Sequence, residues 1–161
     1  MIKKIHQFFV NLHPISFILV MVILSYLITR PFILFLPEVQ SNPSQNEPIY
    51  IQIVSVLIIA PIVETLIFQV FLFWILRCIP WIREHDLLII LIAALMFGLY
   101  HPFGITYIIC ITVTGILYNY AYLIYYKKNE KVQVTISAFG IVFWIHEVDN
   151  IISLTIQNLF F

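Results

Sequence analysis

The sequence has little charge and few cysteines. Only 10% of its 161 residues are Asp, Glu, Lys or Arg, and 62% are hydrophobic. A soluble domain has about 25% charged and about 45–50% apolar residues, and a chain of this length cannot hide the excess apolar surface in one core. The net charge is zero, so no overall field favours nucleic acid, and two cysteines are too few for a disulfide framework. The composition therefore excludes a soluble globular protein and predicts one embedded in lipid.

Five apolar segments approach the length of about 20 residues that a membrane-spanning helix needs. They cover residues 15–36, 49–76, 87–100, 104–126 and about 132–161, and the third is short. A polar stretch with prolines at 37–48, charged turns at 83–86 and 127–131, and a break at 102–104 separate them. We predict an all-α, polytopic transmembrane bundle of about five spans, with a span and outer loop over 1–48 and a core over 49–161.

The basic residues indicate the orientation in the membrane, because cytoplasmic loops are enriched in lysine and arginine. If five spans alternate, seven of the eight basic residues fall on one side: Lys3, Lys4, Arg77, Arg83, Lys127, Lys128 and Lys131. Arg30 is the exception and is expected to snorkel to the outer interface. We therefore predict a multi-pass protein of the cell membrane with a cytoplasmic N-terminus.

A few ionisable and amide side chains lie within the predicted spans. An ionisable group near the middle of the bilayer costs about 2.5–3.5 kcal/mol on insertion scales, so such groups usually face the bundle interior. Glu64 lies near the middle of the second span, His101 ends the third, and His146 lies in the fifth. Asn150 follows His146 by four residues and shares its helical face. These four residues are candidates for one common site.

Three kinds of role fit these residues. A carboxylate held away from water is a better base near neutral pH, and with a histidine beside it can deprotonate a water molecule. A histidine and an amide on another helix can donate hydrogen bonds to a developing oxyanion. Alternatively, the same groups satisfy one another as polar contacts between helices. A zinc site of Glu64, His101 and His146 is a further alternative, although no HExxH motif is present.

Other acidic residues of the last span have weaker functional signals. Glu147 and Asp149 are expected to point away from the face of His146 and Asn150, and to line a water-filled outer vestibule.

Four short motifs, in order, resemble those of the CAAX protease and bacteriocin-processing family. Residues 60–69 (APIVETLIFQ) resemble its first motif, EExxxR after Ala-Pro, and residues 97–101 (FGLYH) match its second, FxxxH. Residues 114–118 (TGILY) resemble its glycine-bearing helix, and residues 146–150 (HEVDN) match its last motif, HxxxN. The order and approximate separations agree over about residues 56–155.

The resemblance implies an intramembrane glutamic endopeptidase over the core at 49–161. Glu64 would be the general base for water, assisted by His101, while His146 and Asn150 would stabilise the oxyanion. No metal and no cofactor would be needed. The implied substrate is a membrane-associated peptide or protein, such as a prenylated protein or a leader peptide. The expected surroundings are the lipid bilayer, with no nucleic acid; the sequence indicates no oligomeric state.

Two positions depart from the family pattern. Thr65 stands where the family has its second glutamate, and Gln69 stands where it has arginine. The joint loss of a glutamate and an arginine avoids an unpaired buried charge, which favours an intact site. The same departures are also compatible with a noncatalytic member that binds a membrane peptide or confers immunity to a bacteriocin.

Overall fold

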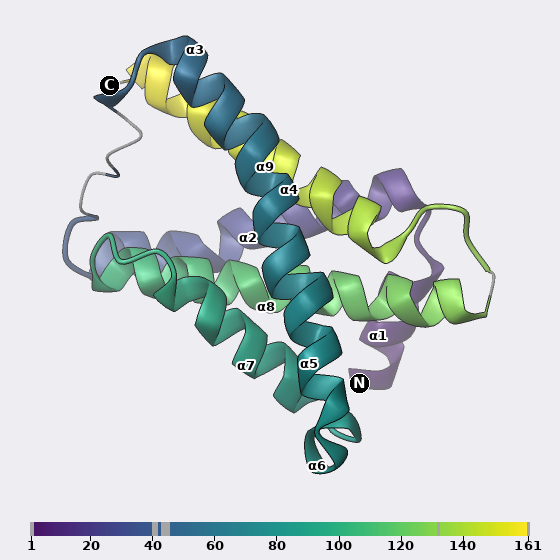
Figure 1. The fold of residues 1–161 in the computed structure, drawn as a ribbon. Coiled ribbons are helices and arrows are strands. Elements are labelled where there is room, and N and C mark those ends of the chain that lie inside the picture. Colours follow the sequence, from purple (N-terminus) through teal and green to yellow (C-terminus); the bar gives the residue numbers. More distant parts are fainter. Residues whose placement is uncertain (1, 40–41, 43–45, 132, 161) are drawn as a thin grey trace.

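A computed structural model describes residues 2–39, 42, 46–131 and 133–160, and the regular elements of this part of the chain are all helices (Figure 1). Within the described residues, four helices are long and apolar enough to cross a membrane, and a fifth apolar helix is shorter. The four are α2 (Pro14–Phe35), a continuous helix over Ile49–Cys78, α8 (Ile105–Glu130) and α9 (Ala138–Phe160), and the shorter one is α7 (Asp86–Leu99). The predicted all-α, polytopic bundle is confirmed.

Two short helices accompany the spans. α1 (Ile2–Asn11) precedes α2 and packs against α8, where the His6 ring contacts the Tyr120 hydroxyl at 2.8 Å. α6 (Pro80–Arg83) directly precedes the predicted charged turn at 83–86 and shares only Arg83 with it. Sequence reasoning predicted neither helix.

The helix over Ile49–Cys78 changes its winding along its length. Its parts are α3 (Ile49–Gln52), the π-helical η2 (Ile53–Ile59), α4 (Ala60–Glu64), the π-helical η3 (Thr65–Phe71) and α5 (Leu72–Cys78). π-helical turns are rare and frequent at functional sites. Glu64 is the last residue of α4 and so lies between the two π-helical segments.

Pro61 and the π-helical register together free one backbone carbonyl, that of Val56. The α-helical partner of this carbonyl would be the N–H of Ala60, but that N–H bonds to Ser55 instead. The π-helical partner would be residue 61, which is proline and has no N–H. The Val56 carbonyl is therefore available to a side chain from another helix.

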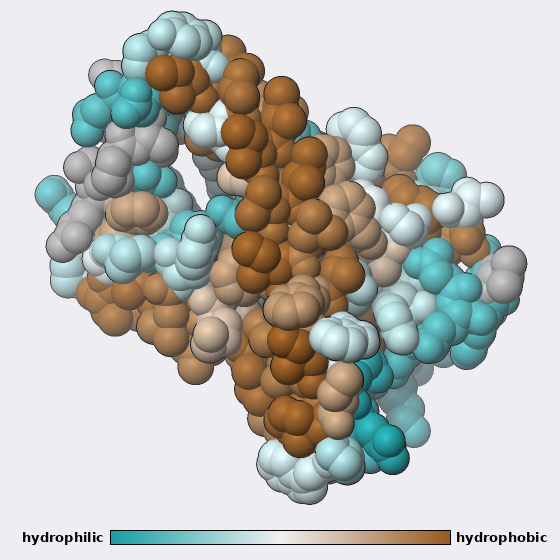
Figure 2. Space-filling view, in the orientation of Figure 1, coloured by the Kyte–Doolittle hydropathy of each residue, from teal (hydrophilic) through white to brown (hydrophobic). Residues whose placement is uncertain are grey.

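The outer surface of the bundle is apolar, as a lipid-facing surface has to be. Figure 2 shows an almost continuous hydrophobic surface over the helix of α3, α4 and α5. Side chains of this face are between 37% and 53% exposed, among them Ile58, Ile59, Ile62, Val63, Leu66 and Ile67. Hydrocarbon is the environment that satisfies such a face.

α7 and α8 form a tightly packed antiparallel pair. Gly98 of α7 lies directly against Thr112 of α8, and a Cβ at position 98 would be 2.8 Å from the Ile108 carbonyl oxygen. At the other end of the pair, Asp86 forms ion pairs with Lys127 and, at 3.0 Å, with Arg77. Close backbone contact at one end and charge pairing at the other fix the register of the two helices.

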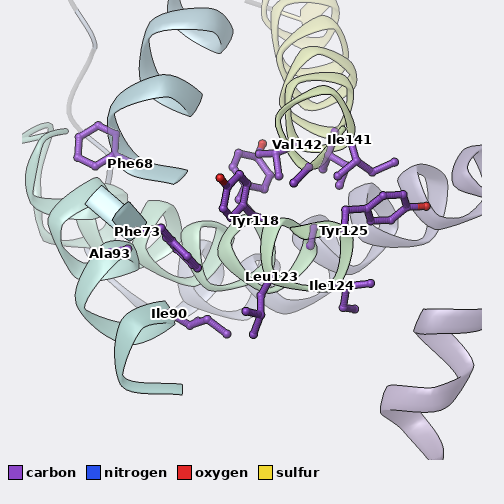
Figure 3. Packing of buried hydrophobic residues seen from close by; sticks show 14 of the residues in the cluster. Phe68, Phe73, Ile90, Ala93, Tyr118, Leu123, Ile124, Tyr125, Ile141 and Val142 are labelled. Atoms are coloured by element: carbon purple, nitrogen blue, oxygen red, sulfur yellow. The ribbon is translucent and has the colours of Figure 1, made fainter. Parts of the chain in front are cut away.

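The hydrophobic core is built around α8, which has the largest buried share of the four long helices. Figure 3 shows its residues Tyr118, Leu123, Ile124 and Tyr125 lying among side chains of the neighbouring helices. These neighbours include Phe73, Ile90, Ile141 and Val142. The buried packing of α8 fixes the positions of the helices that carry the candidate site.

Two predicted boundaries are wrong. α8 continues to Glu130, so Lys127 and Lys128 are helical and not part of a turn. α9 begins at Ala138, because the Ser137 hydroxyl accepts the Gly140 N–H at 2.9 Å as an N-cap. His146 therefore lies in the first half of the last helix.

Some predicted bounds fall on residues 132 and 161, which lie outside the described part, as do residues 40, 41 and 43–45 of the predicted loop at 37–48. The described ends of this loop are tied to neighbouring helices. The Thr106 hydroxyl of α8 donates to the Pro37 carbonyl at 2.6 Å, and the Gln52 amide donates to the Glu47 carbonyl at 2.7 Å. Cys78 and Cys110 are both free thiols.

Candidate active site

Glu64 lies between two histidines that come from other parts of the bundle. Its Oε1 is 3.5 Å from Nε2 of His101, just beyond α7, and its Oε2 is 3.6 Å from Nε2 of His146, in α9. The three side chains are 14%, 13% and 7% exposed, respectively. The structure therefore brings together three of the four residues predicted for one site, with one imidazole at each carboxylate oxygen.

Pro102 explains how His101 is held. The α-helical partner of the Gly98 carbonyl would be residue 102, which has no N–H, and the backbone N–H of His101 bonds to Gly98 instead, at 3.0 Å. This leaves the Phe97 carbonyl free, and the Nδ1 of His101 lies 2.8 Å from it. A carbonyl only accepts, so Nδ1 carries the proton and Nε2 faces Glu64. The FxxxH spacing therefore reflects a hydrogen bond from the histidine side chain to the backbone carbonyl of the phenylalanine four residues earlier.

His146 is held mainly by ring packing. Its ring centroid is 5.2 Å from that of Tyr118 and 6.2 Å from that of Phe97. Its Nδ1 is buried and has no hydrogen-bond partner among the described residues. Phe97 also packs on His101 at 5.0 Å, so a single phenyl ring contacts both imidazoles.

Asn150 makes a different contact from the one that the sequence suggested. Its Nδ2 donates to the Val56 carbonyl at 2.7 Å, the carbonyl that Pro61 and the π-helical register leave free. The bond fastens α9 to η2 one helical turn from His146. One N–H of this amide therefore holds two helices together. Only the second N–H of the amide is left to donate to an oxyanion.

The two departures from the family motif are both buried and neutral, and one of them, Gln69, belongs to a network of amides. Thr65 is fully buried, and its hydroxyl has no partner among the described residues. Gln69 is 1% exposed and donates to the Asn119 side chain at 3.0 Å, while Asn119 donates to the Ile90 carbonyl at 3.3 Å. η3, α8 and α7 are thus joined by amides, without a buried charge.

Asp149 is not where the sequence interpretation placed it. It does not line an outer vestibule but is buried, 8% exposed, between α2, α8 and α9. Its carboxylate accepts hydrogen bonds from the hydroxyls of Ser25 at 3.0 Å and Tyr118 at 2.6 Å. α9 is apolar nearly all round, so its sequence could not show which neighbours this acid would meet.

The described residues contain no group of three His, Cys, Asp or Glu side chains arranged to hold a metal ion. The chain is therefore a polytopic membrane protein in which one glutamate and two histidines lie close together between apolar helices.

Residues 46–134 match the family described as type II CAAX prenyl endopeptidase Rce1-like. The match covers more than half of the sequence, and the chain belongs to this family of glutamic intramembrane proteases. Glu64 and His101 lie within the matched residues, whereas His146 and Asn150 lie beyond them. No curated protein and no solved structure matches the chain.

Proposed function

We propose that the chain is an intramembrane endopeptidase that cleaves a membrane-associated peptide or protein with a water molecule activated by Glu64. The observation that carries the proposal is the placement of the Glu64 carboxylate, with the Nε2 atoms of His101 and His146 at 3.5 Å and 3.6 Å from its two oxygens. A buried acid with an imidazole at each oxygen is suited to accepting and returning a proton.

His101 and Glu64 are arranged to hold the attacking water. In the neutral imidazole with a proton on Nδ1, Nε2 is an acceptor, and the facing carboxylate oxygen is an acceptor too. A water molecule at about 2.8 Å from both atoms can donate one hydrogen to each. The 3.5 Å distance between Nε2 of His101 and Oε1 of Glu64 leaves room for such a bridging water. A lone pair of the water oxygen is then free to attack the peptide carbonyl carbon.

The remaining steps use the same residues. As the water oxygen bonds to the carbonyl carbon, its proton passes to Glu64, and the carbonyl oxygen becomes an oxyanion. His146 can stabilise this charge when Nε2 carries a proton, a contribution worth about 10²–10³ in rate for one such donor. Transfer of the proton from Glu64 to the amide nitrogen allows the C–N bond to break, giving a carboxylic acid and an amine. The acid then gives up the second proton of the water to the amine, which leaves a carboxylate and an ammonium. The residues present can perform each step without a cofactor.

The membrane setting narrows the substrate class. Glu64 is flanked by lipid-facing side chains, so a peptide anchored in the bilayer, by a prenyl group or by an apolar leader, can reach it from the membrane. We infer a cytoplasmic N-terminus in the cell membrane, because α1 and the ends of α5 and α8 carry five of the eight lysines and arginines.

A noncatalytic role in peptide binding or bacteriocin immunity is the second candidate. The engagement of the Asn150 amide with Val56 favours it, together with neutral residues at positions 65 and 69. The same site would then hold a membrane peptide without cutting it.

Vesicles containing the purified protein, incubated with prenylated and leader-type peptides and analysed by mass spectrometry, test the proposal. We expect Glu64→Gln to lower the cleavage rate by at least about 10²-fold, the lower range for a general base. Glu147→Gln is the matched control, since the ion pairs of both imidazoles within the described residues are with Glu64 and not with this half-buried glutamate. Equal cleavage by both variants would refute the role of Glu64. Binding without product, unchanged by Glu64→Gln, would favour the noncatalytic role.

A further inference from the structure

A second buried carboxylate lies beside the site and has no part in the steps above. Asp149 follows His146 by three residues on α9, and it forms no ion pair within the described residues. Two hydroxyls compensate for its burial, both less than 5% exposed. Tyr118 on α8 donates to it, and Ser25 on α2 shares its one hydrogen between this carboxylate and the Val22 carbonyl, which is 2.7 Å away. A buried carboxylate needs such donors, because an unsatisfied one is strongly destabilising.

Tyr118 joins this carboxylate to the candidate active site. Its hydroxyl donates to Oδ2 of Asp149 at 2.6 Å, while its ring packs on His146 with a centroid separation of 5.2 Å and an interplanar angle of 45°. Phe97 packs against Tyr118 at 6.1 Å. The hydroxyl bond therefore fixes the orientation of a ring that forms one wall of the His146 pocket.

His146 depends on this wall more than a histidine usually does. The orientation of a functional imidazole is normally set by a hydrogen bond at the ring nitrogen that faces away from the reaction. In this protein Nδ1 has no such partner among the described residues, so ring packing and the contact with Glu64 determine the angle at which Nε2 is presented.

We propose that Asp149 and Tyr118 are positioning residues, which hold the His146 imidazole in the orientation that stabilises the oxyanion. The inference rests on the proposed hydrolytic function. Asp149 acts through Tyr118, since its hydrogen bond fixes the phenol and the phenol fixes the imidazole.

Variants that separate the two hydrogen bonds of Asp149 test this inference. Tyr118→Phe keeps the ring and removes the hydroxyl, and we expect kcat to fall about 10- to 100-fold, as loss of one hydrogen bond to a charged group implies, with little change in KM. Ser25→Ala is the matched control, because it removes the other hydroxyl from the same carboxylate without touching Tyr118. We expect it to keep kcat within about twofold of the unmodified protein.

The carboxylate itself is tested by a conservative and a disruptive change. Asp149→Leu should lower kcat as far as Tyr118→Phe does, and the double variant should be no slower than either single one, because all three remove the same bond. Asp149→Asn retains an oxygen that can accept from Tyr118 and should restore most of kcat. Additive losses in the double variant would overturn the inference.

A measurement without substrate separates this inference from the proposed function. In protein with isotope-labelled histidine, the ring signals of His146 can be assigned by their absence in His146→Gln. We expect Tyr118→Phe and Asp149→Leu to shift these signals and Ser25→Ala to leave them in place. Unchanged His146 signals in Tyr118→Phe, or equal shifts in Ser25→Ala, would overturn the positioning role. Shifted signals in a protein that cleaves no peptide would uphold the positioning role and contradict the proposed function.

Discussion

The hydrogen bond between Asn150 and the Val56 carbonyl gives the sharpest test of how the bundle is held together. Asn150→Leu has nearly the same shape but no donor, so it leaves the carbonyl unpaired inside apolar surroundings. A buried unsatisfied group costs about 1–3 kcal/mol in general, while hydrogen bonds between membrane helices average about 0.6 kcal/mol. Asn150 is half-buried, and we therefore expect the free energy of unfolding to fall by about 1 kcal/mol.

Pro61→Ala should remove this dependence on Asn150. The change introduces a backbone N–H at position 61, five residues after Val56, which can bond to the Val56 carbonyl in the π-helical register of η2. In the Pro61→Ala background, Asn150→Leu should cost close to nothing. The coupling free energy between the two positions is then about 1 kcal/mol.

Equilibrium unfolding of the four proteins of this cycle in mixed detergent micelles measures the coupling. Asn158→Leu is a matched control on the same helix, because the Asn158 amide donates at 2.8 Å to the Leu154 carbonyl of its own helix and is exposed. We expect it to change the free energy of unfolding by less than about 0.5 kcal/mol. The same cost for Asn150→Leu with and without Pro61 would refute the account of a carbonyl freed by proline.

Two further predictions concern the packing around the site. Gly98→Ala places a Cβ 2.8 Å from the Ile108 carbonyl, so α7 must move away from α8; we expect a loss of about 1–3 kcal/mol and lower cleavage, measured by unfolding and vesicle assays. A thermal midpoint equal to that of the unmodified protein would contradict this. Gln69→Leu leaves the Asn119 carbonyl oxygen unpaired and should cost about 1–3 kcal/mol. The double change Gln69→Leu and Asn119→Leu should cost less than the sum of the single ones.

The fold class could be predicted from the sequence, and so could the proximity of Glu64, His101 and His146. Ionisable side chains are too costly in hydrocarbon to face lipid, so a buried acid on one span and histidines on two others were expected to converge. The spacing of Phe97 and His101 also has a local cause, since Pro102 frees the carbonyl that the imidazole binds.

Other features were not predictable, for physical reasons. The partner of Asn150 is a backbone carbonyl, and the π-helical register that exposes it leaves no periodic signal in a helix that is apolar all round. The same uniformity hid the direction of Asp149. The start of α9 was placed too early because Val134 and Ile136 continue the apolar pattern, although Ser137 before Ala138 is a recognisable capping signal.

The shortness of α7 has a consequence for how the site is hydrated. Its 14 residues rise about 21 Å, whereas the hydrocarbon layer is about 30 Å thick. We therefore expect the chain beyond it, with exposed Tyr100 and Pro102 beside His101, to turn back below the headgroups. Non-helical backbone at that depth is stable only against protein or water, so we expect the bilayer to be thinned or hydrated there. Local thinning of the bilayer would bring bulk water close to Glu64.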